Sequence, residues 1–273
     1  MNIQKPLHDT DIVRAYYDAD AGMEWNRLEN HPVEFELTRR FLSQYIPEGS
    51  RVLDVGGGPG RYALWLAERG CRVVLADLSQ ANVDFALAKA KEAGLPLRGL
   101  RADARDLSAL AGEEFDHVLL MGPLYHLTGA EDRSRAVRAA LSLLAPGGTL
   151  SASFISAFAG VIYAMKEDPS MIVNPDYAED FALVLRDEPF AGMAFTQAYF
   201  ARHQDIVPFM SGFGLAKLRF LSAEGMLAPS EATFLAQPPD VRAAWLDFAQ
   251  SLCERRDILG FAEHYLYIGR KAV

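Results

Sequence analysis

The stretch RVLDVGGGPG, residues 51–60, determines how the rest of the sequence is interpreted. Residues 51–55 form a short apolar run, which is typical of a strand buried on both faces. A glycine-rich turn follows, and residues 62–67 then have the composition of a helix. Strand, glycine turn and helix in this order predict the first crossover of a doubly wound α/β sheet, where nucleotide-like ligands bind. Glycine suits such a turn because the backbone bends sharply and a ligand approaches it without an intervening Cβ atom.

The glycine spacing distinguishes two classes of ligand that use such a turn. Dinucleotide-binding turns have the pattern G-x-G-x-x-G/A. Counted from Gly56, the last glycine would be residue 61, which is Arg61. Counted from Gly58, the pattern is met through Ala63, but the turn then begins three residues beyond the end of the strand. A dinucleotide site is therefore only partly supported by this stretch.

A second pattern, acidic-x-Gly-x-Gly-x-Gly, is met in full by Asp54, Gly56, Gly58 and Gly60. It resembles the first motif of the class I S-adenosylmethionine-dependent methyltransferases. The resemblance implies an α/β fold with a doubly wound, mostly parallel seven-stranded, Rossmann-like sheet and a helical lid. It also implies S-adenosyl-L-methionine as the cofactor, with these four residues in its site.

Composition and charge restrict the remaining possibilities. The 273 residues, half of them hydrophobic, suit one large domain, and no run of 18 or more apolar residues predicts a membrane span. The N-terminus has no apolar centre of a signal peptide, and Cys71 and Cys253 form no metal-spaced pair, so we expect a cytoplasmic protein with reduced thiols. The net charge of −9 argues against a broad electrostatic interaction with nucleic acid.

Asp77 follows the next predicted strand, residues 72–76, and lies 23 residues after Asp54. That separation is right for one strand–helix–strand step, and a carboxylate there can accept hydrogen bonds from both ribose hydroxyls. This applies to NAD as well as to S-adenosylmethionine, so Asp77 indicates a nucleoside without choosing between them. The alternative is a cap of the helix predicted at residues 80–93. Leu78, the next residue, is assigned to the same cofactor site.

A third strand at residues 95–101 leads to Asp103 and Ala104. This stretch resembles the methyltransferase motif in which an acidic residue binds the adenine amino group, with the following backbone beside it. The resemblance therefore assigns Asp103 and Ala104 to the adenine. Asp103 and Asp106 could instead cap a turn.

The fourth strand, residues 115–121, is followed by the sequence GPLYHL. A helix at 131–144, a turn at 144–148 and a fifth strand at 149–155 come next. The run FDHVLLMGPLYHL and the later LLAPGGTLSASF resemble the fourth and fifth methyltransferase segments, and this order over residues 51–155 makes dinucleotide binding the weaker hypothesis. Met121 joins the cofactor site. Tyr125 and His126 are the candidate catalytic residues, because the resembling turn faces the transferring methyl group.

His126 has an ordinary pKa near 6.5, so it can take a proton from an acceptor hydroxyl at neutral pH. Tyr125 can orient the acceptor by a hydrogen bond. The alternative is that His126 packs under the following helix. His117 lies within the fourth strand and is read as a core or edge histidine.

Helices are predicted before the sheet, at residues 11–17 and 33–45, with Pro32 in the first turn of the second. In the resembling methyltransferases such helices cover the cofactor, and an arginine binds the methionine carboxylate. Arg27 is the candidate for that role, and Tyr16, Tyr17 and Trp25 are the candidate lining of the substrate site. The alternative is a solvated arginine and packed aromatics.

The chain is expected to form a single domain, residues 1–273, in the following parts. Lid helices occupy 1–46, the cofactor-binding core 47–155, lid insertions 156–198 and 225–259, and the C-terminal part of the sheet 199–224 and 260–273. Residues 199–210 are predicted as a helix and 215–221 as the sixth strand. The last strand, 262–269, is expected to lie antiparallel between the fifth and sixth, as in the resembling family.

The resulting hypothesis is methyl transfer from S-adenosylmethionine to a small-molecule acceptor by direct displacement. One alternative is a tRNA wobble-uridine carboxyl methyltransferase, because residues 253–256 through 267–270 look similar to such enzymes. Another is a protein that binds S-adenosylmethionine without turnover. No metal site is predicted, since His8, His31, His203 and His264 have no ligand-like spacing.

Overall fold

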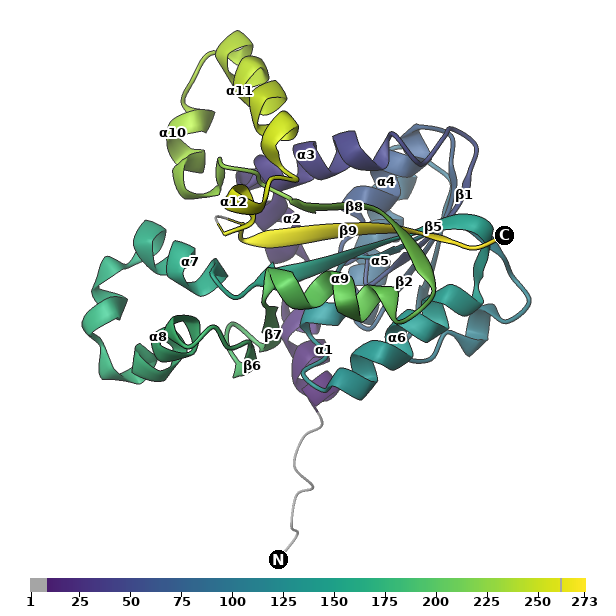
Figure 1. The fold of residues 1–273 in the computed structure, drawn as a ribbon. Helices are drawn as coiled ribbons and strands as arrows, with labels where there is room; N and C mark the ends of the chain where they lie inside the picture. Colours follow the sequence, from purple (N-terminus) through teal and green to yellow (C-terminus); the bar gives the residue numbers. More distant parts are fainter. Residues whose placement is uncertain (1–8, 261) are drawn as a thin grey trace, which may run out of the picture.

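The computed structural model describes residues 9–260 and 262–273, and its centre is one twisted sheet (Figure 1). Five strands of the sheet lie parallel to one another, and their order is β3-β2-β1-β4-β5. Their bounds are β1 Arg51–Val55, β2 Arg72–Asp77, β3 Leu97–Arg101, β4 Phe115–Leu120 and β5 Leu144–Ser156. The five parallel strands predicted from the sequence are thus confirmed.

The sheet continues with one antiparallel strand and one further strand that runs in the direction of the first five. Strand β9 (His264–Lys271) pairs antiparallel with β5 on one side and with β8 (Leu215–Ser222) on the other. The last strand therefore lies between the fifth and sixth predicted strands, as expected. These seven strands form the mostly parallel sheet that the sequence predicts.

A hairpin, β6 (Phe190–Met193) and β7 (Gln197–Ala201), extends this sheet and was not predicted. The prediction of a helix from residue 199 is wrong at its start, because helix α9 (His203–Ser211) begins only after β7. Strand β5 runs on to Ser156, and β7 pairs with its last residues, Ile155↔Phe200 and Ser156↔Ala201. This pairing supplies partners for backbone groups that the long end of β5 would otherwise leave open.

The predicted turn at residues 144–148 is also wrong, since these residues belong to β5. Phe115 pairs with Leu144, and His117 pairs with Thr149. A step of two residues along β4 therefore corresponds to a step of five residues along β5. The Ala-Pro-Gly-Gly sequence forms an irregular bulge there. Bulges and turns share the same residue types, which is why the local sequence does not separate them.

Helices cover both faces of the sheet, and alternate strand residues point to each face. On one face Val52, Leu75 and Leu119 pack with the helices α3 (Pro32–Leu42), α4 (Arg61–Glu68) and α5 (Gln80–Glu92). On the other face Leu53 and Val118 pack with α6 (Ala130–Ser142) and α9. Since both faces are covered, each central strand is a nearly continuous apolar run, and this pattern made the strands recognisable in the sequence.

The remaining helices lie around the sheet (Figure 1). They are α1 (Asp9–Ala19), α2 (Ala21–Asn30), α7 (Ala159–Glu167), α8 (Ala178–Leu185), α10 (Glu231–Leu235), α11 (Pro239–Leu252) and α12 (Arg256–Leu259). Helices α7 and α8 project together to one side, and α10 and α11 project from another. In the described part of the chain, no helix has both the length and the apolarity that a membrane crossing needs.

Candidate active site

A cavity lies where the parallel strands β1, β2 and β4 end, beneath helices α1 and α2. Twelve of the predicted site residues line it: Tyr17, Arg27, Asp54, Gly56, Gly58, Asp77, Leu78, Asp103, Ala104, Met121, Tyr125 and His126. Gly60, Tyr16 and Trp25 do not. Of the described residues after 127, none lines the cavity, although Phe195 and Gln197 of the predicted insertion 156–198 contact the lining residue His126.

The glycine turn combines open and crowded positions. A Cβ atom at Gly56 would come within 2.5 Å of Pro123 Cδ, whereas a Cβ at Gly58 would meet nothing within 4 Å. Gly58 therefore leaves the backbone accessible from the cavity. Gly60 has φ +92°, and a Cβ there would lie 2.8 Å from Ala86 Cβ. Gly60 thus allows α4 to approach α5, and it acts through helix packing rather than as a lining residue.

Asp77 is the last residue of β2 and is buried. Its Oδ2 accepts a hydrogen bond from the Gly58 backbone N–H at 2.9 Å, and its Oδ1 accepts from Ser79 N at 2.9 Å and Asn82 Nδ2 at 3.2 Å. Burial raises the pKa of its carboxyl group, and these hydrogen bonds act against that shift. Asp77 therefore caps the region before α5 and fixes the glycine turn, and it also lines the cavity.

Asp54 is buried at the centre of β1, and its Oδ2 has no hydrogen-bond partner among the described residues. Burial, and after it the charge of Asp77, raises the pKa of Asp54 to about 7. A buried acceptor without a donor is costly to fold. Since Asp54 lines the cavity, a ligand carrying a donor or a positive charge would relieve that cost.

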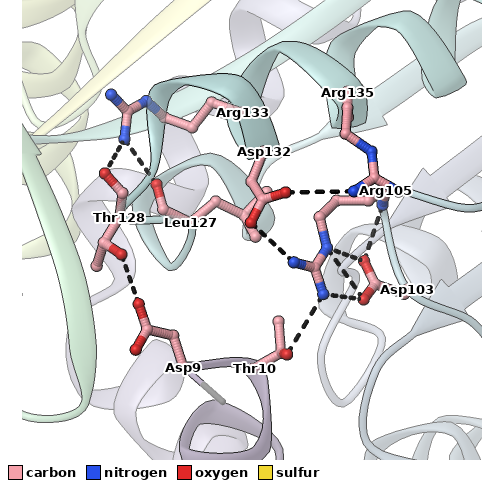
Figure 2. Close-up of polar contacts among 9 residues, drawn as sticks. All are labelled: Asp9, Thr10, Asp103, Arg105, Leu127, Thr128, Asp132, Arg133 and Arg135. Atoms are coloured by element: carbon pink, nitrogen blue, oxygen red, sulfur yellow. Dashed lines mark hydrogen bonds and ion pairs between the residues drawn. The ribbon is translucent and has the colours of Figure 1, made fainter.

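Asp103 lies at the far end of the cavity in a network shown in Figure 2. Its Oδ1 accepts from the Arg105 backbone N–H at 2.9 Å, so the turn-capping alternative is present in the structure. Arg105 also pairs with Asp103 Oδ2 at 2.6 Å and with Asp132 of α6 at 2.8 Å. Burial acts to raise the pKa of Asp103, but Arg105 outweighs it and lowers the pKa.

The same network attaches α1 to the sheet. Arg105 Nη2 donates to Thr10 Oγ1 at 3.3 Å, and Thr128 Oγ1 donates to Asp9 Oδ2 at 2.6 Å (Figure 2). Arg133 Nη1 donates to the backbone carbonyls of Leu127 and Thr128. Residues that follow β3 and β4 thus hold the start of α1 across this end of the cavity.

Arg27 lines the cavity from α2 together with Glu24. Its Nε and Nη2 donate to the two Glu24 carboxylate oxygens at 2.8 and 2.7 Å. Burial acts to lower the pKa of Arg27, yet the hydrogen bonds and charge of Glu24 raise it. The guanidinium is thus held in a carboxylate-binding geometry inside the cavity, and a ligand carboxylate would compete with Glu24.

His126 makes two hydrogen bonds that define its tautomer. Its Nδ1 lies 3.0 Å from the Gln197 carbonyl oxygen, which can only accept, so Nδ1 carries the proton. Its Nε2 lies 2.8 Å from the Tyr17 hydroxyl and accepts a hydrogen bond from it. Burial lowers the pKa of His126 to about 4. His126 is therefore neutral at pH 7 and its one lone pair is occupied, which argues against the predicted role as a free general base.

The aromatic residues form a wall around this pair. The Tyr125 ring meets His126 edge-on at 4.8 Å and His264 at 6.4 Å between ring centroids. Tyr16 lies behind the wall, 5.1 Å from Tyr17, and does not reach the cavity. Burial raises the pKa of Tyr125 and of Tyr17. Both hydroxyls therefore stay protonated at neutral pH.

Trp25 lies on the outer side of α2, where it is not part of the cavity wall. Its ring packs at 5.7 Å against Phe85 and lies 4.9 Å from the Arg61 guanidinium carbon. Its Nε1 donates to Glu29 at 2.9 Å. Trp25 thus joins α2 to α4 and α5, and the packing alternative describes it better than the lining role.

The sequence analysis missed several cavity residues. Glu24 and Glu34 face the cavity from the N-terminal helices, and Tyr62 and Asn82 face it from α4 and α5. Acidic residues in a first helical turn are ordinary dipole partners, so Glu34, two residues after Pro32, gave no separate signal. The packing of the helices α2 to α5 around the strand ends identifies these residues.

Comparison with known proteins adds a family to this geometry. The family described as "Methyltransferase domain" matches residues 52–148. The ubiquinone biosynthesis O-methyltransferase of Cereibacter sphaeroides is 30% identical over 191 residues, which cover 64% of this chain and 71% of that protein. The tRNA 5-carboxymethoxyuridine methyltransferase of Escherichia coli is 32% identical over 159 residues, 53% of this chain and 60% of that one.

The fold comparison agrees. The magnesium protoporphyrin IX methyltransferase of Synechocystis PCC 6803, solved with bound S-adenosylmethionine, has a TM-score of 0.59 at 17% identity. The match covers 98% of this chain and 100% of that one. The chain belongs to the class I S-adenosylmethionine-dependent methyltransferases, and the cofactor of that family is S-adenosylmethionine.

Proposed function

We propose that this protein transfers a methyl group from S-adenosylmethionine to a small-molecule acceptor by direct displacement. The observation that supports this most is that one cavity is lined both by the glycine turn with Asp77 and by the pair Tyr17–His126. The glycine turn and Asp77 suit a nucleoside, and Tyr17 and His126 place polar groups beside it. Family membership gives the reaction class.

The residues of the cavity are suited to this cofactor. Asp54 Oδ2 and Asn82 Oδ1 are buried without hydrogen-bond partners among the described residues, and both residues line the cavity. Gly58 leaves the turn open to a close approach. Asp77 and Asp103 are assigned to the ribose and the adenine, and Arg27 to the carboxylate. When bound, S-adenosylmethionine supplies an electrophilic methyl group on a sulfonium.

Alignment is the main catalytic contribution that the side chains offer. A well-oriented pair of reactants gains about 7–11 kcal/mol over the bimolecular reaction. The Tyr17 hydroxyl donates its hydrogen bond to His126 Nε2, so its oxygen is left to accept a hydrogen bond from an acceptor O–H or N–H. His126, fixed by Gln197, thus acts as a positioning residue for Tyr17.

The alternative of a tRNA acceptor has a similar relative, but the charge of the peripheral segments does not support it. Residues 156–198 contain seven acidic and two basic residues, and residues 225–259 contain five and three. Residues 1–46 contain eight acidic and five basic residues. A protein that binds tRNA releases counterions through clustered Lys and Arg, whereas all three of these segments are acidic. A small acceptor is therefore the better proposal.

The test is a screen of small hydroxylated and amine acceptors with methyl-labelled S-adenosylmethionine, with tRNA that carries 5-carboxymethoxyuridine at the wobble position as a parallel arm. We expect label transfer to a small molecule and none to tRNA. Calorimetry with S-adenosylhomocysteine runs beside it. Binding without transfer to any acceptor in a broad panel would favour the non-catalytic alternative, and labelled tRNA would replace the small-molecule proposal.

A further inference from the structure

Three ionisable side chains from distant parts of the chain meet behind Tyr125. Glu34 comes from the first turn of α3, Glu224 follows β8, and His264 begins β9. One ligand atom from each lies within 4.8 Å of the other two. The three side chains are only 12%, 8% and 16% exposed, in that order. In the described part of the chain, this is the one such group of three that the fold assembles.

Glu224 and His264 already hold each other in place. Glu224 Oε1 lies 2.6 Å from His264 Nδ1, and Glu224 Oε2 accepts the His264 backbone N–H at 3.1 Å. A carboxylate that makes hydrogen bonds to both the ring and the backbone of one residue has a fixed orientation, as metal-binding carboxylates need. The loop after β8 and the start of β9 therefore form a rigid half of the group.

Glu34 is the member of the group whose carboxylate has the fewest contacts. Its nearest ion-pair atom is His264 Nδ1 at 3.7 Å, and its carboxylate makes no hydrogen bond within the described ranges 9–260 and 262–273. It also lines the cavity, so a ligand can reach it from there. A largely buried carboxylate with no donor is unfavourable unless a cation accompanies it.

The chemistry of the donor set points to the charge of that cation. Two carboxylates and a neutral imidazole together carry two negative charges. A divalent ion that replaces the imidazole proton would compensate both.

We propose that Glu34, Glu224 and His264 bind a divalent transition-metal ion, with Mn²⁺, Fe²⁺ or Zn²⁺ as the suitable class. Mixed carboxylate and imidazole donors favour these ions over Ca²⁺ or Mg²⁺. Bonds of about 2.0–2.2 Å to such an ion place neighbouring ligand atoms roughly 3.0–3.5 Å apart. The observed separations of 2.6 and 3.7 Å lie on either side of that range, so small side-chain shifts complete the site.

The position suggests what the ion does. Glu34 lines the cavity and the His264 ring lies 6.4 Å from Tyr125, so an ion held by the three side chains would be next to the proposed acceptor end. An ion there would bind an oxygen of the acceptor. The metal site itself does not depend on the proposed function, because its three ligands are all contributed by this chain.

The experiment is calorimetric titration of chelator-treated full-length protein with Mn²⁺, repeated with Zn²⁺ and Mg²⁺. We expect one Mn²⁺ or Zn²⁺ per chain with micromolar affinity and much weaker Mg²⁺ binding. Glu34→Gln and Glu224→Gln should each weaken Mn²⁺ binding by at least about tenfold. The matched control is His31→Gln, which removes another His–Glu pair, His31 Nδ1 to Glu231 Oε2 at 2.8 Å, that has no second carboxylate.

Several results would overturn the proposal. They are the absence of saturable Mn²⁺ or Zn²⁺ binding, Mn²⁺ binding unchanged in Glu34→Gln, and equal losses in His31→Gln. S-adenosylhomocysteine affinity, measured on the same samples, separates this test from the proposed function. If Glu34→Gln weakened only S-adenosylhomocysteine binding, Glu34 would be a partner for the cofactor ammonium group rather than a metal ligand. Thermal unfolding of each variant shows that the fold is retained.

Discussion

At the residue scale, the contact between Tyr17 and His126 changes the role expected for the histidine. The sequence places His126 after the fourth strand, and this position is confirmed. Its partners come from 109 and 71 residues away, from α1 and from β7. No local pattern predicts such partners, so the sequence identified the residue but not its protonation or its role.

Tyr17 and His126 should behave as one unit in kinetics. Losing their hydrogen bond removes about 0.5–1.5 kcal/mol, so Tyr17→Phe should lower kcat by roughly 2–12-fold. His126→Ala should have a similar effect, and the double variant should be no worse than the more affected single one. The measurement is a double-mutant cycle on kcat with an identified acceptor, with Tyr16→Phe as the control behind the wall. A loss of about 10²–10⁴ in His126→Ala alone would restore the general-base role.

His126 should also make stability depend on pH. Its pKa is about 4 in the folded protein and near 6.5 when unfolded, so below pH 6.5 the unfolded chain binds a proton that the folded chain does not. The free energy of unfolding should therefore fall as the pH drops from 6.5 toward 4, by about 3 kcal/mol in total from this group. The check is urea denaturation of the wild type and His126→Gln at several pH values. Parallel curves for the two proteins would contradict it.

At the element scale, the sequence predicted the order and direction of the core strands because each carries a continuous apolar run. Predictions failed where pairing is decided by distant segments. The hairpin β6–β7 exists because β5 is long enough to pair with it, and the bulge in β5 depends on the register with β4. Helices α7 and α8 contribute no lining residue to the cavity, whereas α1 and α2 do.

Helix α1 should be the mobile cover, and Arg105 should control it. Arg105→Ala removes contacts to Asp103, Asp132 and Thr10, so amide exchange in residues 9–19 should become faster. The matched control is Arg98→Ala, which breaks an exposed pair with Glu113. The measurement is hydrogen–deuterium exchange followed by mass spectrometry. Unchanged exchange in residues 9–19 would show that these contacts do not hold the helix.

Cofactor binding should affect the peripheral helices differently. With S-adenosylhomocysteine, residues 9–30 should gain protection because α1 and α2 contribute cavity residues. Residues 159–185 should change little, because none of them lines the cavity. The measurement is hydrogen–deuterium exchange of both segments with and without S-adenosylhomocysteine. Equal gains in both segments would indicate that α7 and α8 also close over the site.

At the scale of the whole molecule, the fold brings four strand ends and residues of the helices α1 to α5 to one cavity. The strand-end residues Asp54, Asp77 and Asp103 were predictable because they follow apolar runs at regular spacing. Residues such as Glu34 and His264, which are 230 residues apart, were not, since only the closed sheet brings them together. The net charge of −9 is in keeping with a small acceptor rather than a nucleic acid.

The most direct test of the central claim is calorimetric titration of S-adenosylhomocysteine into wild-type protein and Asp77→Ala. Asp77 holds the Gly58 amide and faces the cavity, and hydrogen bonds to a charged group are worth about 1.5–3 kcal/mol each. We predict one ligand per wild-type chain and an affinity at least about tenfold weaker in folded Asp77→Ala. NAD should give no heat. No binding of S-adenosylhomocysteine, or equal affinity in the two proteins, would contradict the account.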